Sequence, residues 1–340
     1  MHNIFIIYTG GTIGMVQDEE TGTFIPFDFE LIEKNLPDLS RLNYELTVHS
    51  FDPIIDSSNM RPSIWLEMAK IIRDNYTKYD GFVVLHGSDT MAFSASMLSF
   101  LLEGLQKPVI FSGSQLPIGE IRTDARENLM TALEIASAKK DGRSIIQEVC
   151  ILFDNKLFRG NRSFKYNSDK FEAFRSPNYP VLAEAGIHIR YNEEVLLNND
   201  DKEFICHYDI DNQVGVLKLF PGISTETIEA VLNSNVRSIV METFGSGNTM
   251  TDKWFLDLLE GAIKSGKNIL DISQCKVGSV ELGRYETSQG LQTIGVLNGY
   301  DMTFETAVTK LMYLQGELSS QEEVAHWVQQ PIRGELTKND

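Results

Sequence analysis

The run Ile4-Phe5-Ile6-Ile7-Tyr8, followed directly by Thr9-Gly10-Gly11-Thr12-Ile13-Gly14, decides how this chain folds. An uninterrupted apolar run rich in isoleucine predicts a strand that is buried on both faces, as in a parallel sheet. Glycine accepts positive φ and lets a ligand approach the main chain, so the paired glycines predict a tight turn at the strand end. Ligands of open α/β sheets bind outside the carboxyl ends of the strands. Thr12 is therefore a candidate nucleophile, and the amides around Gly11 are candidate oxyanion donors.

Phosphate binding is the main competing interpretation of this turn. The dinucleotide fingerprint needs glycine where Thr9 stands, and a helix directly afterwards. Residues 15–26 contain Gly22 and Pro26, which predict a hairpin or a flexible loop instead. A P-loop is excluded because no Gly-Lys-Ser/Thr follows. A plain structural turn stays open on this segment alone.

A second strand end has similar chemistry. The apolar run ending at Leu85 leads into His86-Gly87-Ser88-Asp89-Thr90-Met91, and a helical pattern follows from Ala92 to Leu105. The free amides and the dipole of a helix N-terminus favour anions. Ser88 and Asp89 could instead be simple helix caps. Two such strand ends in one domain favour a shared crevice.

The chain alternates between strand and helix patterns, which predicts an α/β fold with two α/β domains and mainly parallel sheets. We expect a larger N-terminal domain over residues 1–190, a linker over 191–212 that is rich in Asn, Asp and Glu, and a smaller C-terminal domain over 213–340. The predicted strands lie near residues 3–8, 44–50, 81–85, 108–112, 148–153, 214–220, 238–244 and 268–274. The predicted helices lie near residues 28–35, 63–76, 91–105, 124–138, 225–232, 252–265, 303–313 and 320–329.

Composition excludes several classes of function. The net charge of −18 argues against partners such as nucleic acid and anionic membranes. Cys150, Cys206 and Cys275 are scattered and resemble reduced thiols, so we expect a cytoplasmic protein without a disulfide framework. The chain opens directly into its first strand, so we expect no signal peptide, and no apolar stretch is long enough to span a bilayer. The six histidines show no metal-ligand spacing, so no metal site is predicted.

The two strand-end motifs together resemble the signature motifs of bacterial-type L-asparaginases, most closely those of the cytoplasmic type I branch. The segment Asp56-Ser57-Ser58-Asn59-Met60 is similar to the substrate-binding segment of that family. Residues 159–165 resemble the loop that carries its catalytic lysine, which would be Lys165. Further similarity lies at residues 184–189, 244–248 and 333–336, so the resemblance covers nearly the whole chain.

The resemblance implies hydrolysis of L-asparagine to L-aspartate and ammonia. Thr12 would attack the side-chain amide and form an acyl-enzyme ester. Ser88, Asp89 and Lys165 would form the proton relay, since a lysine can accept a proton once desolvation favours its neutral form. Backbone amides near Gly11 and Ser88 would stabilise the tetrahedral oxyanion.

Substrate recognition and assembly are also implied by the resemblance. Asp89 would bind the α-ammonium group, while the Ser57 hydroxyl and the backbone amides of Asp56, Ser57 and Ser58 would hold the α-carboxylate. Asn248, which lies in a Gly-rich turn, would reach the site from a neighbouring subunit. We therefore expect a homodimer or homotetramer that acts on a small-molecule substrate and needs no cofactor.

The sequence departs from the family pattern at three positions. Ser88 replaces the usual threonine, which keeps the hydroxyl group but loses the methyl group that restricts its rotamer. Phe24 stands where the family has a tyrosine in its flexible loop, which puts the need for that tyrosine in doubt. Glu242 stands where some cytoplasmic relatives use an arginine to bind an effector asparagine. A carboxylate would repel that effector, so we expect a hyperbolic dependence of velocity on asparagine concentration.

Two alternatives of different classes stay open. The amidase subunit of a glutamyl-tRNA amidotransferase shares these motifs, but it would carry a domain before the first strand and would need a partner protein. A non-catalytic amino-acid or nucleotide sensor would need no nucleophile, and Thr12, Asp89 and Lys165 argue against it.

Overall fold

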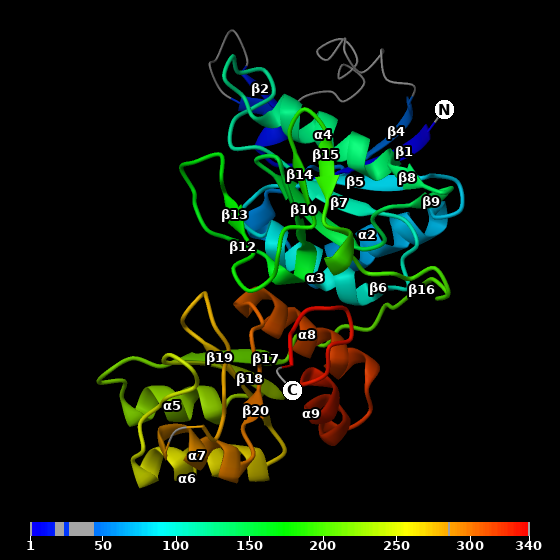
Figure 1. Ribbon diagram of the computed structural model, residues 1–340. Helices are drawn as coiled ribbons and strands as arrows, with labels where there is room; N and C mark the ends of the chain where they lie inside the picture. The colour runs from blue at the N-terminus through cyan, green and yellow to red at the C-terminus, as the bar shows by residue number, and fades with distance from the viewer. Residues whose placement is uncertain (1, 18–23, 27–43, 285, 339–340) are drawn as a thin grey trace. The chain divides into compact units, whose positions relative to one another are not determined.

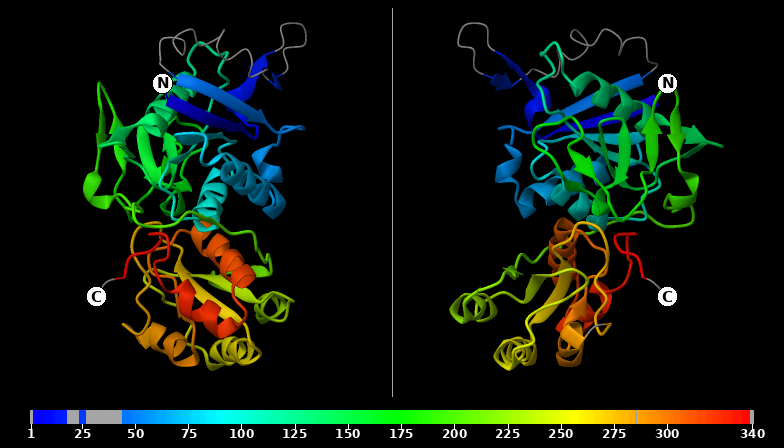
Figure 2. Two further views of the ribbon diagram at one scale, coloured as in Figure 1. Left: turned by 90° about the vertical axis from the view of Figure 1, so that its right-hand side faces the viewer. Right: turned by 60° about the vertical axis from the view of Figure 1, so that its left-hand side comes forward.

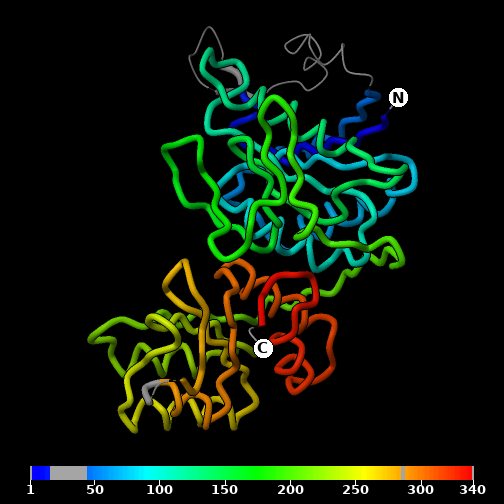
Figure 3. Tube along the Cα trace, viewed as in Figure 1, coloured from blue at the N-terminus to red at the C-terminus, as the bar shows by residue number. Residues whose placement is uncertain are grey.

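The computed structural model describes residues 2–17, 24–26, 44–284 and 286–338. The chain divides into two compact units, with the boundary after His207. Each unit alternates between strands and helices. Figure 3 traces the chain through them from the blue N-terminus to the red C-terminus. The predicted boundaries at residues 190 and 213 stay predictions, as does the role of 191–212 as a linker.

An eight-stranded sheet forms the centre of the first unit, in the order β15-β14-β11-β10-β7-β5-β1-β4 among the described residues (Figure 1). Strands β4, β1, β5, β7 and β10 are parallel to one another, whereas β11, β14 and β15 are antiparallel. Its strands are β1 (His2–Tyr8), β4 (Tyr44–Ser50), β5 (Gly81–Leu85), β7 (Val109–Ser112), β10 (Val149–Phe153), β11 (Lys156–Arg159), β14 (Ala183–Ala185) and β15 (Ile189–Tyr191).

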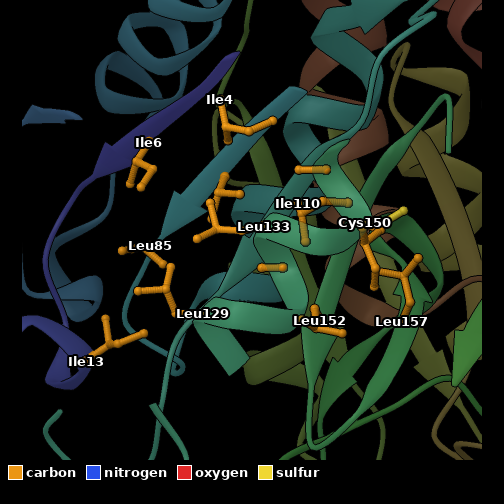
Figure 4. Packing of buried hydrophobic residues seen from close by; sticks show 14 of the residues in the cluster. Ile4, Ile6, Ile13, Leu85, Ile110, Leu129, Leu133, Cys150, Leu152 and Leu157 are labelled. Atoms are coloured by element: carbon orange, nitrogen blue, oxygen red, sulfur yellow. The ribbon is translucent and has the colours of Figure 1, made fainter. Parts of the chain in front are cut away.

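Helices cover both faces of this sheet. The helix α4 (Ala125–Ser137) packs on one face, and α2 (Pro62–Asn75) and α3 (Met91–Leu101) lie on the other (Figure 1). Under α4, a buried aliphatic cluster joins the helix to alternate residues of β1 and β5, and Figure 4 shows Leu129 and Leu133 beside Ile4, Ile6 and Leu85. Burial of this apolar surface stabilises the packing of α4 against β1 and β5, and it thereby fixes the carboxyl ends of both strands.

Short elements extend from the sheet. The hairpin β2 (Met15–Gln17) and β3 (Phe24–Pro26) follows the first strand end, and β12 (Phe164–Lys165) pairs with β13 (Phe174–Arg175). Two other pairs join β6 (Leu102–Glu103) to β16 (Ile205–Cys206) and β8 (Lys139–Lys140) to β9 (Arg143–Ser144). The 3-10 helices among the described residues are η1 (Thr12–Gly14), η4 (Ser57–Asn59), η5 (Gly160–Arg162) and η6 (Glu193–Val195).

The second unit contains a smaller parallel sheet in the order β17-β18-β19-β20. Its described elements are β17 (Val214–Lys218), α5 (Thr225–Leu232), β18 (Ser238–Thr243), α6 (Lys253–Lys264), β19 (Asn268–Ser273), α7 (Glu286–Ile294), β20 (Leu297–Asn298), α8 (Phe304–Glu317) and α9 (Gln321–Val328). Figure 2 shows α8 and α9 on one side of this sheet and α5 and α6 on the other.

The predicted fold class, two α/β domains with mainly parallel sheets, is confirmed. The predicted helix over 91–105 is too long, because α3 ends at Leu101 and β6 begins at the next residue. The antiparallel strands after β10 were not predicted, since β11, β14 and β15 are too short to show a clear period. The helix predicted over 28–35 lies outside the described residues. In the described part of the chain, no helix is both long and apolar enough to cross a bilayer.

A buried ion pair fastens the segment Arg333-Gly334-Glu335-Leu336 to α8. The Lys310 ammonium contacts the Glu335 carboxylate, and both side chains are fully buried. Lys310 also donates to the Gln330 carbonyl oxygen at 2.6 Å, while Glu335 accepts from the amides of Ile332 and Arg333. Burial disfavours the Glu335 carboxylate, but the Lys310 charge and these donors together lower its pKa. The pair supplies the partners that a buried charge requires.

A buried carboxyl group, that of Asp271, lies in the sheet of the second unit. Asp271 lies in the middle of β19 and is fully buried. Its Oδ1 accepts a hydrogen bond from the Thr243 hydroxyl at 2.7 Å, and its Oδ2 has no hydrogen-bond partner among the described residues. Burial raises the pKa of Asp271 from the usual 3.8 to about 7, and the Thr243 bond only partly opposes this. The folded chain therefore binds this proton more tightly than the unfolded chain does.

We predict that Asp271→Asn stabilises the protein increasingly as pH rises. In the wild type, the free energy of unfolding falls as pH rises from the unfolded pKa near 3.8 through about 7. A neutral amide removes this loss, so the gain should grow by roughly 3 kcal/mol between pH 5 and pH 8. Denaturant unfolding at both pH values measures it, with exposed Asp257→Asn as the control. An Asp271→Asn gain that does not change with pH would contradict this assignment.

Candidate active site

The candidate site lies between β1 and β5, where the strand order of the first sheet reverses. From β1 the chain continues to β4 on one side, and from β5 it continues to β7 on the other side. This is the switch point of an open parallel sheet, where the loops after neighbouring strands diverge and leave a crevice. Tyr8 is paired with Leu85 at the ends of β1 and β5, so the two loops start at the same level.

The loop after β1 is pressed against two other backbone segments. Gly10 and Gly11 have φ values of 138° and 93°, which only glycine adopts readily. A Cβ on Gly10 would lie 2.2 Å from the Ile55 carbonyl oxygen, and one on Gly11 would lie 2.6 Å from Cα of Gly87. The two glycines therefore permit a close approach that any side chain would prevent. Thr12 follows at once as the first residue of η1 and is half-buried.

The loop after β5 connects this turn to the segment after β4. A Cβ on Gly87 would lie 2.6 Å from Oγ of Ser57, which is itself buried. Thr90 donates its hydroxyl to the Ser57 carbonyl oxygen at 2.6 Å. Gly87 is thus held between Gly11 and Ser57. Three segments that are distant in sequence meet at this point of the backbone.

Three predicted side chains are brought together beside Gly87. Nζ of Lys165 donates to Oγ of Ser88 at 2.7 Å and to Oδ1 of Asp89, also at 2.7 Å. The Lys165 side chain is 18% exposed and the Asp89 side chain 65% exposed. An amine held between a hydroxyl and a carboxylate can exchange protons with the hydroxyl while the carboxylate stabilises its charged form.

A buried ion pair positions the segment that carries Lys165. Arg159 ends β11 and donates to Glu148 at 2.6 Å, and both side chains are almost fully buried. Although burial opposes the charged form, the Glu148 carboxylate raises the pKa of Arg159. The turn η5 and strand β12 follow, and Tyr166 donates its amide to the Ala173 carbonyl oxygen across the hairpin. Lys165 therefore projects from a short strand that is anchored at both ends.

The contacts of the other predicted site residues give less direct evidence for their predicted roles. In the described part of the chain, no hydrogen bond joins the Thr12 hydroxyl to Ser88 or Lys165. Asp56 caps η4 by accepting from the Ser58 amide at 2.8 Å, and both residues are exposed. Asn248 lies in the second unit, in a tight turn closed by the bridge between Phe244 and Asn248. Its predicted contribution to a neighbouring subunit's site stays a prediction.

Two positions that depart from the family pattern, Phe24 and Glu242, lie in different units of the structure. The Phe24 backbone is paired with Gln17 in the β2–β3 hairpin, and its side chain lies outside the described set. Glu242 is buried near the end of β18 and forms an ion pair with Lys218 at 3.3 Å. In the described residues, no group of three or more His, Cys, Asp or Glu side chains is arranged to hold a metal ion.

Two polar residues near the site were not singled out from sequence. Thr90 joins the β5 loop to the Ser57 segment, and Gln115 donates its side-chain amide to the Lys170 carbonyl oxygen at 2.9 Å. Gln115 thereby links the loop after β7 to the hairpin that carries Lys165. Thr90 lies two residues after Ser88 in the same strand-end motif, so its spacing could have indicated a role. No local sequence pattern indicates a role for Gln115, because its hydrogen-bond partner Lys170 is distant in sequence.

Comparison with known proteins gives matches that cover nearly all of this chain. The family model described as "Asparaginase, N-terminal" matches residues 3–197, and "Glutaminase/Asparaginase C-terminal domain" matches residues 213–328. L-asparaginase 1 of Escherichia coli strain K12 is 40% identical over 99% of both chains. The 60 kDa lysophospholipase of Mus musculus is 38% identical over 98% of this chain and 62% of that protein.

A solved structure supports the same relationship. The crystal structure of L-asparaginase I from Vibrio cholerae matches with a TM-score of 0.89 and 41% identity, over 99% of each chain. The family models together account for both units, and the glycine turn, the Ser88–Asp89 loop and Lys165 all lie in the part that the N-terminal model matches. The chain belongs to the asparaginase family.

Proposed function

We propose that this chain is an L-asparagine amidohydrolase that works through a threonine acyl-enzyme. One observation carries the proposal, namely Lys165 Nζ within 2.7 Å of both Ser88 and Asp89, in the loop that touches Gly11. This arrangement supports a proton relay that acts beside the turn that presents Thr12. The similarity to L-asparaginase 1 supports asparagine as the substrate.

In the first half-reaction, the Thr12 hydroxyl oxygen attacks the carbon of the substrate's side-chain amide. Its proton passes through Ser88 and Lys165 and leaves on the amide nitrogen, so that the C–N bond breaks and ammonia departs. The tetrahedral oxyanion accepts hydrogen bonds from backbone amides near Gly11 and Ser88.

In the second half-reaction, the relay removes a proton from water as the water attacks the ester. The ester bond breaks, the Thr12 oxygen recovers a proton, and aspartate is released. The carboxylate of Asp89 stabilises the ammonium form of Lys165 in both halves, at a separation of 2.7 Å. All the groups that this cycle needs are side chains or backbone amides, so it requires no cofactor.

Substrate recognition depends on two opposite charges at a set distance. Asp89 is exposed enough to accept the α-ammonium group while it still contacts Lys165. The Ser57 hydroxyl and the amides of Asp56, Ser57 and Ser58 face the α-carboxylate in this proposal, and the contact of Ser57 with Gly87 supports this placement. The three scattered cysteines, none of which is paired in a disulfide in the structure, support a cytoplasmic location.

We predict that the wild type releases ammonia from L-asparagine and that Thr12→Ala lowers kcat by several orders of magnitude, because the attacking oxygen has no substitute. Thr12→Ser is the matched control, since it keeps a hydroxyl group and should retain measurable activity. Ammonia release from asparagine, glutamine and D-asparagine measures the effect. Thr12→Ala activity within tenfold of wild type would rule out Thr12, and fatty-acid release from a lysophospholipid without ammonia release would point to a different hydrolase.

Two relay variants should differ in their kinetic signatures. Lys165→Met removes the proton acceptor and should lower mainly kcat. Asp89→Asn removes the ammonium partner as well as a relay charge, so it should lower kcat and also raise KM. Steady-state kinetics on both variants checks this. The relay assignment fails if both keep the wild-type kcat and change only KM.

We infer a homo-oligomer in which Asn248 reaches the site of a neighbouring subunit. The family resemblance and the position of Asn248 in a tight turn support this proposal. Sedimentation velocity at micromolar concentration should give a dimer or a tetramer, and Asn248→Ala should raise KM without dissociating it. A strictly monomeric, fully active protein would contradict both statements.

A further inference from the structure

A chain of buried hydrogen bonds supports the loop that carries Ser88 and Asp89. Nε1 of Trp65 donates to Oγ of Ser94 at 2.9 Å. Oγ of Ser94 lies 2.8 Å from Nε2 of His86, and Nδ1 of His86 lies 2.6 Å from the Gly87 carbonyl oxygen. The three side chains are at most 6% exposed. They come from α2, α3 and the end of β5, and none of them is part of the relay described above.

The donor and the acceptor in each of these hydrogen bonds follow from the chemistry of the two end groups. An indole N–H can only donate, and a carbonyl oxygen can only accept. Nδ1 of His86 must therefore carry a hydrogen toward Gly87. In the neutral ring Nε2 is then an acceptor, so the Ser94 hydroxyl donates to it and accepts from Trp65. Burial lowers the pKa of His86 to about 4, which keeps the ring neutral at physiological pH.

This fixed tautomer controls the orientation of the next peptide unit. In a planar trans peptide, the C=O group and the following N–H group point in opposite directions. The Gly87 carbonyl points toward the buried imidazole, so the Ser88 N–H points away from it, out of the core. In the described part of the chain this N–H donates to no protein group. It belongs to the residue whose hydroxyl contacts Lys165.

We propose that His86 is a positioning residue that aims the Ser88 N–H at the oxyanion, with Ser94 and Trp65 holding its ring. The inference rests on the proposed hydrolysis and assigns His86 no contact with substrate. The peptide after a glycine can rotate more freely than most, so a hydrogen bond at Gly87 has a large effect on the direction of the Ser88 N–H. Loss of one oxyanion donor typically lowers kcat by about 10²–10³-fold.

A matched pair of variants separates the two ends of the imidazole. His86→Asn places an amide nitrogen near the position of Nδ1, so it keeps the donor to Gly87 and loses the contact with Ser94. His86→Gln reaches the position of Nε2, so it keeps the contact with Ser94 and loses the donor to Gly87. We expect kcat for asparagine to fall about 100-fold in His86→Gln and less than about tenfold in His86→Asn, with KM within a few-fold of wild type in both. Equal losses of kcat, or a change in KM alone, would overturn the proposal.

A second test reads the protonation of His86 in the wild-type protein itself, and a variant serves only to assign the signal. Two-bond proton–nitrogen correlations on protein with ¹⁵N-labelled histidine report which ring nitrogen carries the hydrogen. The signal of His86 is the one missing from His86→Asn, among the six histidines of the chain. We expect a neutral ring protonated at Nδ1 and unchanged from pH 6 to 9.

The outcomes of the two tests are distinguishable. A ring protonated at Nε2, or a charged ring at pH 7, would overturn the role of His86 whatever the kinetics show. A wild-type protein that releases no ammonia from asparagine would overturn the proposed hydrolysis and the oxyanion role together. The NMR result would then still decide whether the hydrogen-bond chain runs from Trp65 to Gly87.

Discussion

The close contact between Gly11 and Gly87 is the constraint on which the rest of the site depends. A single added Cβ on Gly11 would come within 2.6 Å of the Gly87 backbone, and one on Gly87 would come equally close to Ser57. Because both residues lack a side chain, the loops after β1 and β5 can touch without any spacer. Thr12 and Ser88 each follow directly after one of these glycines. The separation between the proposed nucleophile and the proposed relay is therefore set by backbone packing.

Much of the fold could be predicted from sequence because the parallel strands are long apolar runs that end at glycine-containing turns. The same runs placed the candidate site, since carboxyl ends of neighbouring parallel strands meet at one edge. The antiparallel strands after β10 could not be predicted in this way, because each spans at most four residues. The extent of α3 was overestimated because Leu102 and Leu105 continue its apolar pattern although the backbone leaves the helix at Leu101.

The contacts that hold the site residues in place could not be predicted from local sequence patterns. His86 lies in the signature motif, but its contact with Ser94 joins two elements, and Trp65 fits the apolar face of α2 as an ordinary core residue. The pairing of Arg159 with Glu148 likewise depends on the antiparallel register of β10 and β11. Residue roles can be inferred from a family resemblance, whereas the contacts that hold those residues require the tertiary structure.

The central claim is that the Gly11–Gly87 contact aligns Thr12 with the side-chain end of a bound amino acid. A crystal structure of the protein with aspartate, the proposed product, tests it most directly. We expect Oγ of Thr12 within about 3.5 Å of the side-chain carboxyl carbon. The Ser88 N–H should donate to an oxygen of that carboxylate, and Asp89 should contact the α-ammonium group. Aspartate bound with its α-carboxylate at Thr12, or bound away from the two glycines, would contradict the account.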